Sequence, residues 1–295
     1  MSYQEINTDD AREITAIDKR IAELNVEREQ LLQRKQIILN RPKSHRIRVN
    51  LSTDQKVSIF KNLFRGRADI FATRWQNSQG RSGYSVACSN EWVKKVCEKP
   101  RIKCNVCPNK EYKKLNDQII YDHLAGKQVV GLYPLLTDNT CYLLAADFDK
   151  EGWQETVRAM SRACLHFEIP HAIEISRSGN GAHLWIFFSE SVQAKDARLL
   201  GFGLLDKAME IHPDLSFDSY DRLFPNQDIM PEGGFGNLIA LPLQHQARQQ
   251  GNSLFVDPDL LPYADQWSFL DHLNTISLKQ LNDLLVVFTP NTLTD

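Results

Sequence analysis

Two aspartates one residue apart follow directly after a short apolar run. Residues 141–146 read Cys-Tyr-Leu-Leu-Ala-Ala, and Asp147, Phe148 and Asp149 come next. The apolar run predicts a buried strand, and because side chains alternate along a strand, both carboxylates point to one side. Two carboxylates this close repel each other, and this repulsion either raises the pKa of one of them or favours the binding of a divalent cation such as Mg²⁺ or Mn²⁺. A strand that ends in solvent and has no functional role could have the same sequence.

A glycine-rich turn is the second candidate site, because residues 178–183 read Ser-Gly-Asn-Gly-Ala-His. The apolar runs at 172–176 and 184–188 flank this turn, and both predict strands. Glycines let backbone amides approach a ligand closely, so Ser178, these amides and His183 would together suit a polyphosphate. The simpler alternative is an ordinary hairpin turn whose histidine begins a strand.

Four cysteines lie within twenty residues in the spacing C-x8-C-x6-C-x2-C, namely Cys88, Cys97, Cys104 and Cys107. Four thiolates at such close spacing suit tetrahedral Zn²⁺, and disulfides are disfavoured in a reducing compartment. The spacing therefore predicts a structural zinc module at 88–110, with Cys88 as the least typical ligand because the first interval is long. Cys141 and Cys164 stand alone in apolar segments, which predicts core positions.

Positive charge is concentrated in one part of the chain, although the formal net charge is only −2. Residues 34–114 contain 20 Lys and Arg against 5 Asp and Glu, and the remaining residues contain 15 against 32. A cationic region can hold nucleic-acid phosphates, whereas a solvated lysine-rich surface would give the same counts. Arginines here alternate with aromatic residues, which is typical of phosphate binding and base stacking: Arg65, Arg67 and Arg74 beside Phe64, Phe71 and Trp75.

Apolar residues at three- and four-residue spacing predict a long amphipathic helix over 10–40, which ends by Arg41 because Pro42 follows. This helix could self-associate, pack on the rest of the chain or bind another protein. Further helices are predicted at 53–64, 153–167 and 192–211, with two short ones within 265–285. A strand at 129–135 is predicted to pair with the strand at 141–146 through a turn at 137–139. Strands with helices packed on their sheet form an α+β fold.

The chain has 295 residues, of which 42% are hydrophobic, and this suffices for a sizeable core. No window approaches the about 18 uninterrupted apolar residues of a membrane span. The first residues also lack the apolar centre of a signal peptide. We therefore expect a cytoplasmic protein that does not bind membranes.

These motifs resemble those of the archaeo-eukaryotic primase superfamily, the primase-polymerases. Asp147 and Asp149 match its first motif, and Ser178 with His183 resembles a longer version of its second motif. The segments 217–228 and 236–242 resemble its third arrangement, an aspartate followed by a strand. The favoured aspartate is Asp221, and its alternates are Asp228 and Asp218. The likeness covers 63–269 and is strongest to the primase domains of TOTE conflict systems and to CRISPR-associated primase-polymerases.

This resemblance implies an RRM-like palm, with an inserted four-cysteine zinc module and a long N-terminal helix. The chain would then divide into the helix at 1–45 and a catalytic domain at 46–290. The implied activity is a template-dependent nucleotidyltransferase, a DNA primase-polymerase that initiates and extends chains. Its partners would be a single-stranded DNA template, a primer and nucleoside triphosphates, together with a helicase or CRISPR-associated proteins.

The resemblance also implies a role for each candidate residue. Two Mg²⁺ or Mn²⁺ ions would be held by Asp147, Asp149 and Asp221. The incoming triphosphate would be bound by Ser178, His183, Arg177 and Arg222, and the nucleic acid by Arg65, Arg67 and Arg74. A metal-dependent nuclease could use the same carboxylates to activate water, and a non-catalytic zinc-containing module that binds single-stranded nucleic acid would not need them. The glycine-rich turn favours the polymerase, because a nuclease does not bind a triphosphate.

Overall fold

A computed structural model describes residues 13–17, 19–21, 24, 28, 51–213 and 216–288 of the chain. It divides into two units, Met1–Val49 and Asn50–Asp295. In the first unit every described residue is helical and exposed, including Ile14 and Ile17. The rest of the helix predicted over 10–40 lies outside the described residues, so its length and its partner stay predictions.

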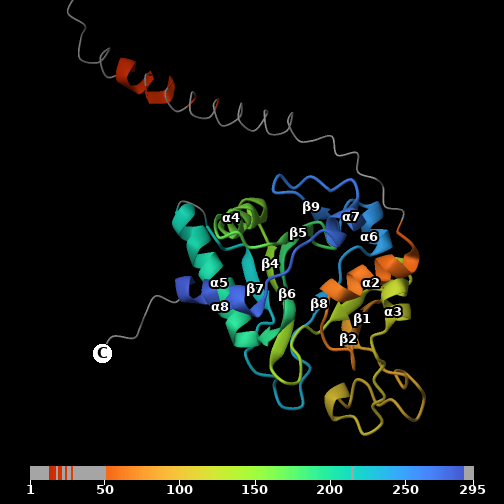
Figure 1. The fold of residues 1–295 in the computed structure, drawn as a ribbon. Coiled ribbons are helices and arrows are strands. Elements are labelled where there is room, and N and C mark those ends of the chain that lie inside the picture. The colour runs from red at the N-terminus through yellow and green to blue at the C-terminus, as the bar shows by residue number, and fades with distance from the viewer. Residues whose placement is uncertain are drawn as a thin grey trace, which may run out of the picture. The chain divides into compact units, whose positions relative to one another are not determined.

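The larger unit contains a five-stranded antiparallel sheet with the strand order β7-β4-β6-β5-β9 (Figure 1). Its strands are β4 (Thr140–Asp149), β5 (Ala172–Ile175), β6 (Gly181–Gln193), β7 (Tyr220–Phe224) and β9 (Phe255–Val256). The strand predicted at 141–146 is confirmed, and it continues through both aspartates. The long strands β4 and β6 form the centre, so residues at the end of β4 have neighbours on both sides.

Three helices cover one face of this sheet: α4 (Trp153–His166), α5 (Ala194–Ile211) and α8 (Leu278–Phe288) (Figure 1). Leu144, Ala146 and Phe148 of β4 point into this layer, as the alternation of side chains requires. Cys141 and Cys164 are fully buried in the same layer, which confirms their predicted core positions. No helix in the described parts of the chain combines the length and apolar character that a membrane crossing needs.

The other face of the central sheet packs on a second layer that holds a four-stranded sheet of order β2-β1-β3-β8. Its strands are β1 (Ala72–Gln76), β2 (Ser82–Val86), β3 (Val130–Leu132) and β8 (Ile239–Ala240). The helices are α2 (Thr53–Leu63), α3 (Asp117–Leu124), α6 (His245–Gln249) and α7 (Gln266–Asp271), and Cys104–Val106 forms a 3₁₀ turn. Phe64 joins the layers, because its ring meets Trp185 and Phe187 of β6 edge-on with centroids 5.1 Å apart.

Local signals explain where these helices begin. Ser52 and Gln55 form a capping box at the start of α2, and each side chain bonds the other's backbone N–H. Asn116 caps α3 by accepting the N–H of Ile119. The helices predicted at 53–64, 153–167, 192–211 and within 265–285 are therefore confirmed to within a few residues at their ends.

The strand predicted at 129–135 does form, but its predicted partner is wrong. β3 pairs with β1 and β8 of the second sheet, whereas β4 pairs with β6 and β7. Pro134 has no N–H to donate and ends the strand, after which the chain crosses to the other sheet. The turn at 137–139 closes locally instead, because the N–H of Leu136 donates to the carbonyl of Thr140 at 2.8 Å.

Candidate active site

The predicted acidic residues lie at the adjoining ends of β4 and β7. Asp147 and Asp149 follow Leu143 and Ala145 on the face of β4 that meets the second layer. Asp147 pairs with Arg222, and Phe148 pairs with Tyr220, so Asp221 is the extra residue of a β-bulge. A bulge redirects side chains, which is why Asp221 and Arg222 both reach the aspartate pair although they are neighbours in a strand.

Negative charge accumulates at this end of the sheet. Burial raises the pKa of Asp147, and repulsion from Asp149 and Asp221 adds to that rise, while His183 and Arg222 act against it. Asp149 Oδ1 is buried and has no hydrogen-bond partner in the described part of the chain. A buried acceptor without a donor, beside two further carboxylates, is the arrangement that a hard cation stabilises.

Asp221 is held by Arg222, whose Nε donates to Asp221 Oδ2 at 2.5 Å. This bond is the main reason that the pKa of Arg222 is raised. Within the described ranges, no three His, Cys, Asp or Glu side chains converge closely enough to hold a metal ion. The three carboxylates therefore lie near one another without forming a finished ligand set. The bond from Arg222 uses Oδ2 of Asp221, so Oδ1 can contribute to a metal site without that bond breaking.

The two alternate aspartates lie apart from this cluster. Asp228 forms an ion pair with Arg198 of α5 at 2.6 Å, and α5 covers the opposite face of the sheet. Asp218 is exposed, and its N–H donates to the hydroxyl of Ser216. Of the three aspartates considered for the third motif, Asp221 is the one whose charge acts on Asp147.

A histidine bridges the cluster to a carboxylate that the sequence analysis missed. His183 lies opposite Asp147 in β6, with its Nε2 3.4 Å from Asp147 Oδ1. Its Nδ1 is 2.6 Å from Glu174 Oε2, and Glu174 lies opposite His183 in β5. Burial lowers the pKa of His183, but Glu174 and Asp147 outweigh this effect and raise the pKa above its usual value. The imidazole thus lies between two carboxylates that favour its protonated form.

Glu174 is buried more completely than the aspartates, with 1% of its surface exposed. It also accepts hydrogen bonds from Trp185 Nε1 and Ser253 Oγ, both at 3.3 Å. A buried carboxylate with this many donors is fixed in place. The signal for it was present in the sequence, because a charged residue interrupts the apolar strand at 172–176.

The glycine-rich turn joins β5 to β6 and packs against the end of β4. A Cβ at position 181 would lie 2.4 Å from the carbonyl oxygen of Phe148, so only Gly181 allows this approach. Gly179 has φ +79°, a backbone region that favours glycine. Ser178 is exposed, and its hydroxyl accepts the N–H of Asn180 at 3.2 Å. His183 lies three residues beyond the turn, inside β6, and not in the turn itself.

Comparison with known proteins identifies the family of the chain. The family model described as the archaeo-eukaryotic primase domain of TOTE conflict systems matches residues 55–284. The chain belongs to this primase family. Primase-polymerases are nucleotidyltransferases that use divalent metals, and the α+β fold with antiparallel sheets is the fold expected of them.

No curated protein matches the sequence of this chain. Among solved structures, it is similar to the polymerase domain from Mycobacterium tuberculosis Ligase D in complex with DNA. The two chains are 12% identical with a TM-score of 0.38, and the match covers 82% of this chain and 89% of that chain.

Two arginines of the primase domain lie close enough for their charges to interact. Burial lowers the pKa of Arg177, and the positive charge of Arg74 lowers it further. Arg177 Nε is buried and has no hydrogen-bond partner among the described residues. Arg177 follows β5 and Arg74 lies in β1, so the two sheets together place a pair of like charges that an anion would stabilise.

Arg65 and Arg67 are engaged within the fold. Arg65 donates to the carbonyl oxygens of Phe188 and Ser189 at 2.8 and 3.2 Å, and its guanidinium lies 4.0 Å from the centre of the Tyr142 ring. Arg67 forms a two-point ion pair with Asp69. Of the three arginines predicted to bind nucleic acid, Arg74 is therefore the one that the structure brings beside Arg177.

Residues 88–114, the segment that contains the four cysteines, form a compact lobe, which we call the cysteine lobe, next to the β1–β2 hairpin. Cys88, Cys97, Cys104 and Cys107 are free thiols that line one cavity of about 20 Å³, which is large enough for a single water or ion. Burial, together with three of the cysteines, raises the pKa of Tyr112 to about 12. The sulfur atoms do not converge into a metal-binding group in the described structure, so zinc at this site stays a prediction.

Proposed function

We propose that this primase domain joins nucleotides on a single-stranded DNA template, and that it both initiates and extends chains. The observation that carries the proposal is that Asp147, Asp149 and Asp221 lie near one another at one end of the central sheet, where a buried Asp149 oxygen has no hydrogen-bond partner among the described residues. This donor set fits Mg²⁺ or Mn²⁺. Two such ions, when bound, lower the pKa of the attacking 3′-hydroxyl and neutralise the charge of the α-phosphate and departing pyrophosphate.

The remaining groups of the site bind and orient the substrates. His183 lies beside Asp147, and Glu174 fixes its ring and favours its protonated form. Arg177, Arg222, Ser178 and the amides of the turn would bind the incoming triphosphate. Arg74 would neutralise the phosphate of the nucleic acid. The reaction requires little covalent chemistry from the protein, so the positioning of the substrates and the charges around them account for the catalysis.

One assay separates this function from the alternatives. The purified protein is incubated with Mg²⁺ or Mn²⁺, nucleoside triphosphates and primed or unprimed single-stranded DNA. A polymerase gives longer products, a nuclease gives shorter products, and a non-catalytic module gives only a mobility shift. Shorter products or a mobility shift alone would overturn the proposal.

The third carboxylate can be identified by comparing two aspartates in this assay. We expect Asp221→Ala to lower primer extension by about 100- to 1000-fold, the usual cost of losing one electrostatic contact to a reacting group. Asp228→Ala should change extension only a few-fold, because it breaks an exposed pair with Arg198 that is worth about 0–1 kcal/mol. The opposite order of effects would assign the third ligand to Asp228.

We also propose that the four cysteines hold a structural zinc ion and that their lobe contributes to initiation. Initiation must hold two nucleotides without a primer, so it depends on more protein contacts than extension does. Cys104→Ala with Cys107→Ala should lose about one zinc per chain and should impair unprimed synthesis far more than primer extension. Zinc content and both activities are measured, with Cys164→Ala as the matched control.

Cys164 lies in the core of α4, away from the lobe, so its replacement should leave the zinc content unchanged. If the double variant loses both activities equally and also melts at a lower temperature, the metal serves folding alone. That result would contradict the role in initiation.

A further inference from the structure

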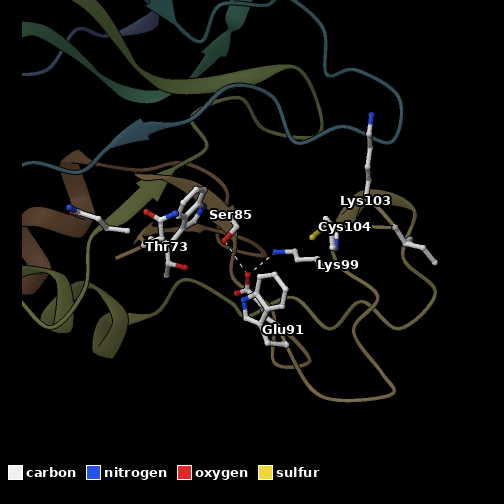
Figure 2. Close-up of a pocket in the computed structure, with 12 residues that line it drawn as sticks. Thr73, Ser85, Glu91, Lys99, Lys103 and Cys104 are labelled. Carbon is white, nitrogen blue, oxygen red and sulfur yellow. Dashed lines mark hydrogen bonds and ion pairs between the residues drawn. The ribbon is translucent and has the colours of Figure 1, made fainter. Parts of the chain in front are cut away.

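A larger cavity lies outside the carboxylate cluster, between the β1–β2 hairpin and the cysteine lobe (Figure 2). Its volume is about 770 Å³, which falls in the range of about 300–1,000 Å³ typical of small-molecule sites. The hairpin contributes Trp75 and Ser85, and the lobe contributes Glu91, Trp92 and Lys99. The cavity therefore combines aromatic walls with polar and cationic groups.

Hydrogen bonds fix the two walls of this cavity relative to each other. Glu91 Oε1 accepts from Lys99 Nζ at 2.7 Å and from Ser85 Oγ at 3.2 Å, and Figure 2 shows these three side chains pointing toward one another. Lys99 and Glu91 are about one-fifth exposed, so water competes little for these bonds. Lys99 also interacts with Cys104, which extends the network to the cysteines. These bonds thus hold the walls of the cavity in place without a bound ligand.

Trp75 provides a flat surface on the hairpin wall. Its strand partner is Gly83, and a Cβ at position 83 would lie only 2.9 Å from the Trp75 ring. The ring can lie across the hairpin because the glycine has no side chain. Trp75 nevertheless remains 46% exposed, so part of its aromatic surface is available for stacking.

Trp92 provides a second aromatic surface, on the lobe. It is 68% exposed, and the ammonium of Lys99 lies 5.7 Å from the centre of its ring. Its φ is +62°, a left-handed conformation that is uncommon for a residue other than glycine. Backbone strain of this kind clusters at ligand sites. A large apolar side chain held exposed in a strained position is more readily explained by a binding role than by packing.

The charge around the cavity indicates what class of ligand it would take. Residues 88–114 contain eight Lys and Arg against three Glu, and Lys103 is among the cavity residues. Proteins bind single-stranded nucleic acid without sequence preference through aromatic side chains that are surrounded by cationic residues. This charge balance favours a polyanion over an apolar peptide.

We propose that this cavity binds an unpaired base of single-stranded DNA, stacked on Trp75 and Trp92, while neighbouring lysines such as Lys103 hold the adjacent phosphates. Trp75 follows Arg74 in β1, and Arg74 lies near enough to Arg177 to lower the pKa of Arg177. Thr73 and Trp75 line the cavity, whereas Arg74 between them points to the other face of β1, so the cavity is a separate site from the Arg74–Arg177 pair. Base binding itself needs neither a metal ion nor a triphosphate, so it can be tested separately from catalysis.

The test measures the binding of a fluorescent single-stranded oligonucleotide to the full chain by anisotropy, without divalent metal or nucleotides. Trp75→Ala and Trp92→Ala should each weaken binding by about 5- to 100-fold, the affinity equivalent of one base stacked on an aromatic ring. Gly83→Ala should also weaken binding, because it displaces the Trp75 ring without removing it. Tyr121→Ala is the matched control. Tyr121 lies in α3 and is an exposed aromatic residue with the ammonium of Lys127 over its ring.

An oligonucleotide of abasic sites tests the same proposal without altering the protein. The unmodified chain should bind it more weakly than the normal oligonucleotide by a similar factor, and the tryptophan variants should show no further loss with it. Equal binding of both oligonucleotides by the unmodified chain would overturn the proposal, as would unchanged affinity in both tryptophan variants. Because nucleotide addition is not measured, failure of the catalytic proposal would leave this result unaffected.

Discussion

Replacing Asp147 and Asp149 together with Ala should lower nucleotide addition by about 1000-fold or more, because each carboxylate contributes charge that the reacting phosphates cannot obtain elsewhere. Binding of single-stranded DNA should stay within a few-fold of normal, because Arg74 and the lysines of the cysteine lobe are untouched. Primer extension with Mg²⁺ or Mn²⁺ and oligonucleotide anisotropy measure the two quantities. Extension that persists in the double variant would contradict the assignment of these residues as metal ligands.

The same variant should not lose activity through unfolding. The pKa of Asp147 is raised by burial, so the folded state binds the proton more tightly than the unfolded state does. The stability that this residue contributes is present below the unfolded pKa of about 3.9 and is lost as the pH rises through the folded pKa. Near neutral pH the ionised carboxylate of Asp147 therefore opposes folding, and its removal should maintain or raise the melting temperature of the metal-free protein. A lower melting temperature would show that the aspartates stabilise the fold.

Much of this architecture was predictable because its elements are set by local patterns. The apolar run before Asp147 predicts a strand because a strand buried on both faces is apolar throughout, and the spacing in α4 and α5 predicts helices because one side of each helix is buried. The pairing of β3 was not predictable in this way. Its partners lie in segments far apart along the chain, and a short fully buried strand gives no sign of which edge it joins.

The site was predictable only in part, for related physical reasons. Regular alternation would turn Asp221 and Arg222 to opposite faces of β7, and a one-residue bulge brings both to the cluster. Arginine beside aromatic residues predicted phosphate binding, and nothing in the sequence indicated that Nη2 of Arg65 would donate to two carbonyl groups of the fold. Glu174 was missed because its role depends on strand register, which places it opposite His183 and so behind Asp147.

Glu174 supports the second large effect that we expect. Glu174→Ala should lower the free energy of unfolding by about 3–5 kcal/mol, because it leaves the buried His183 ring without the carboxylate that is its closest partner and that favours its protonated form. Glu174→Gln keeps the shape of the side chain and removes only its charge, and it should lower nucleotide addition by about 10- to 100-fold, as is usual for a residue that orients another functional group. Ser253→Ala is the control, since it removes one hydrogen bond from an uncharged hydroxyl to Glu174 and no charge.

The pH dependence of stability distinguishes the charge of Glu174 from its packing. Although burial lowers the pKa of His183, Glu174 and Asp147 raise it above the usual value, so the stability gained from the protonated ring is fully present below an unfolded pKa of about 6.5. That stability is lost as the pH rises through the folded pKa. The stability difference between the unmodified chain and Glu174→Gln, measured by denaturant unfolding without metal, should therefore be largest in mild acid and should narrow in alkali. A difference that stays constant over this range would mean that Glu174 acts through packing and hydrogen bonds alone, and that the charge of His183 is set elsewhere.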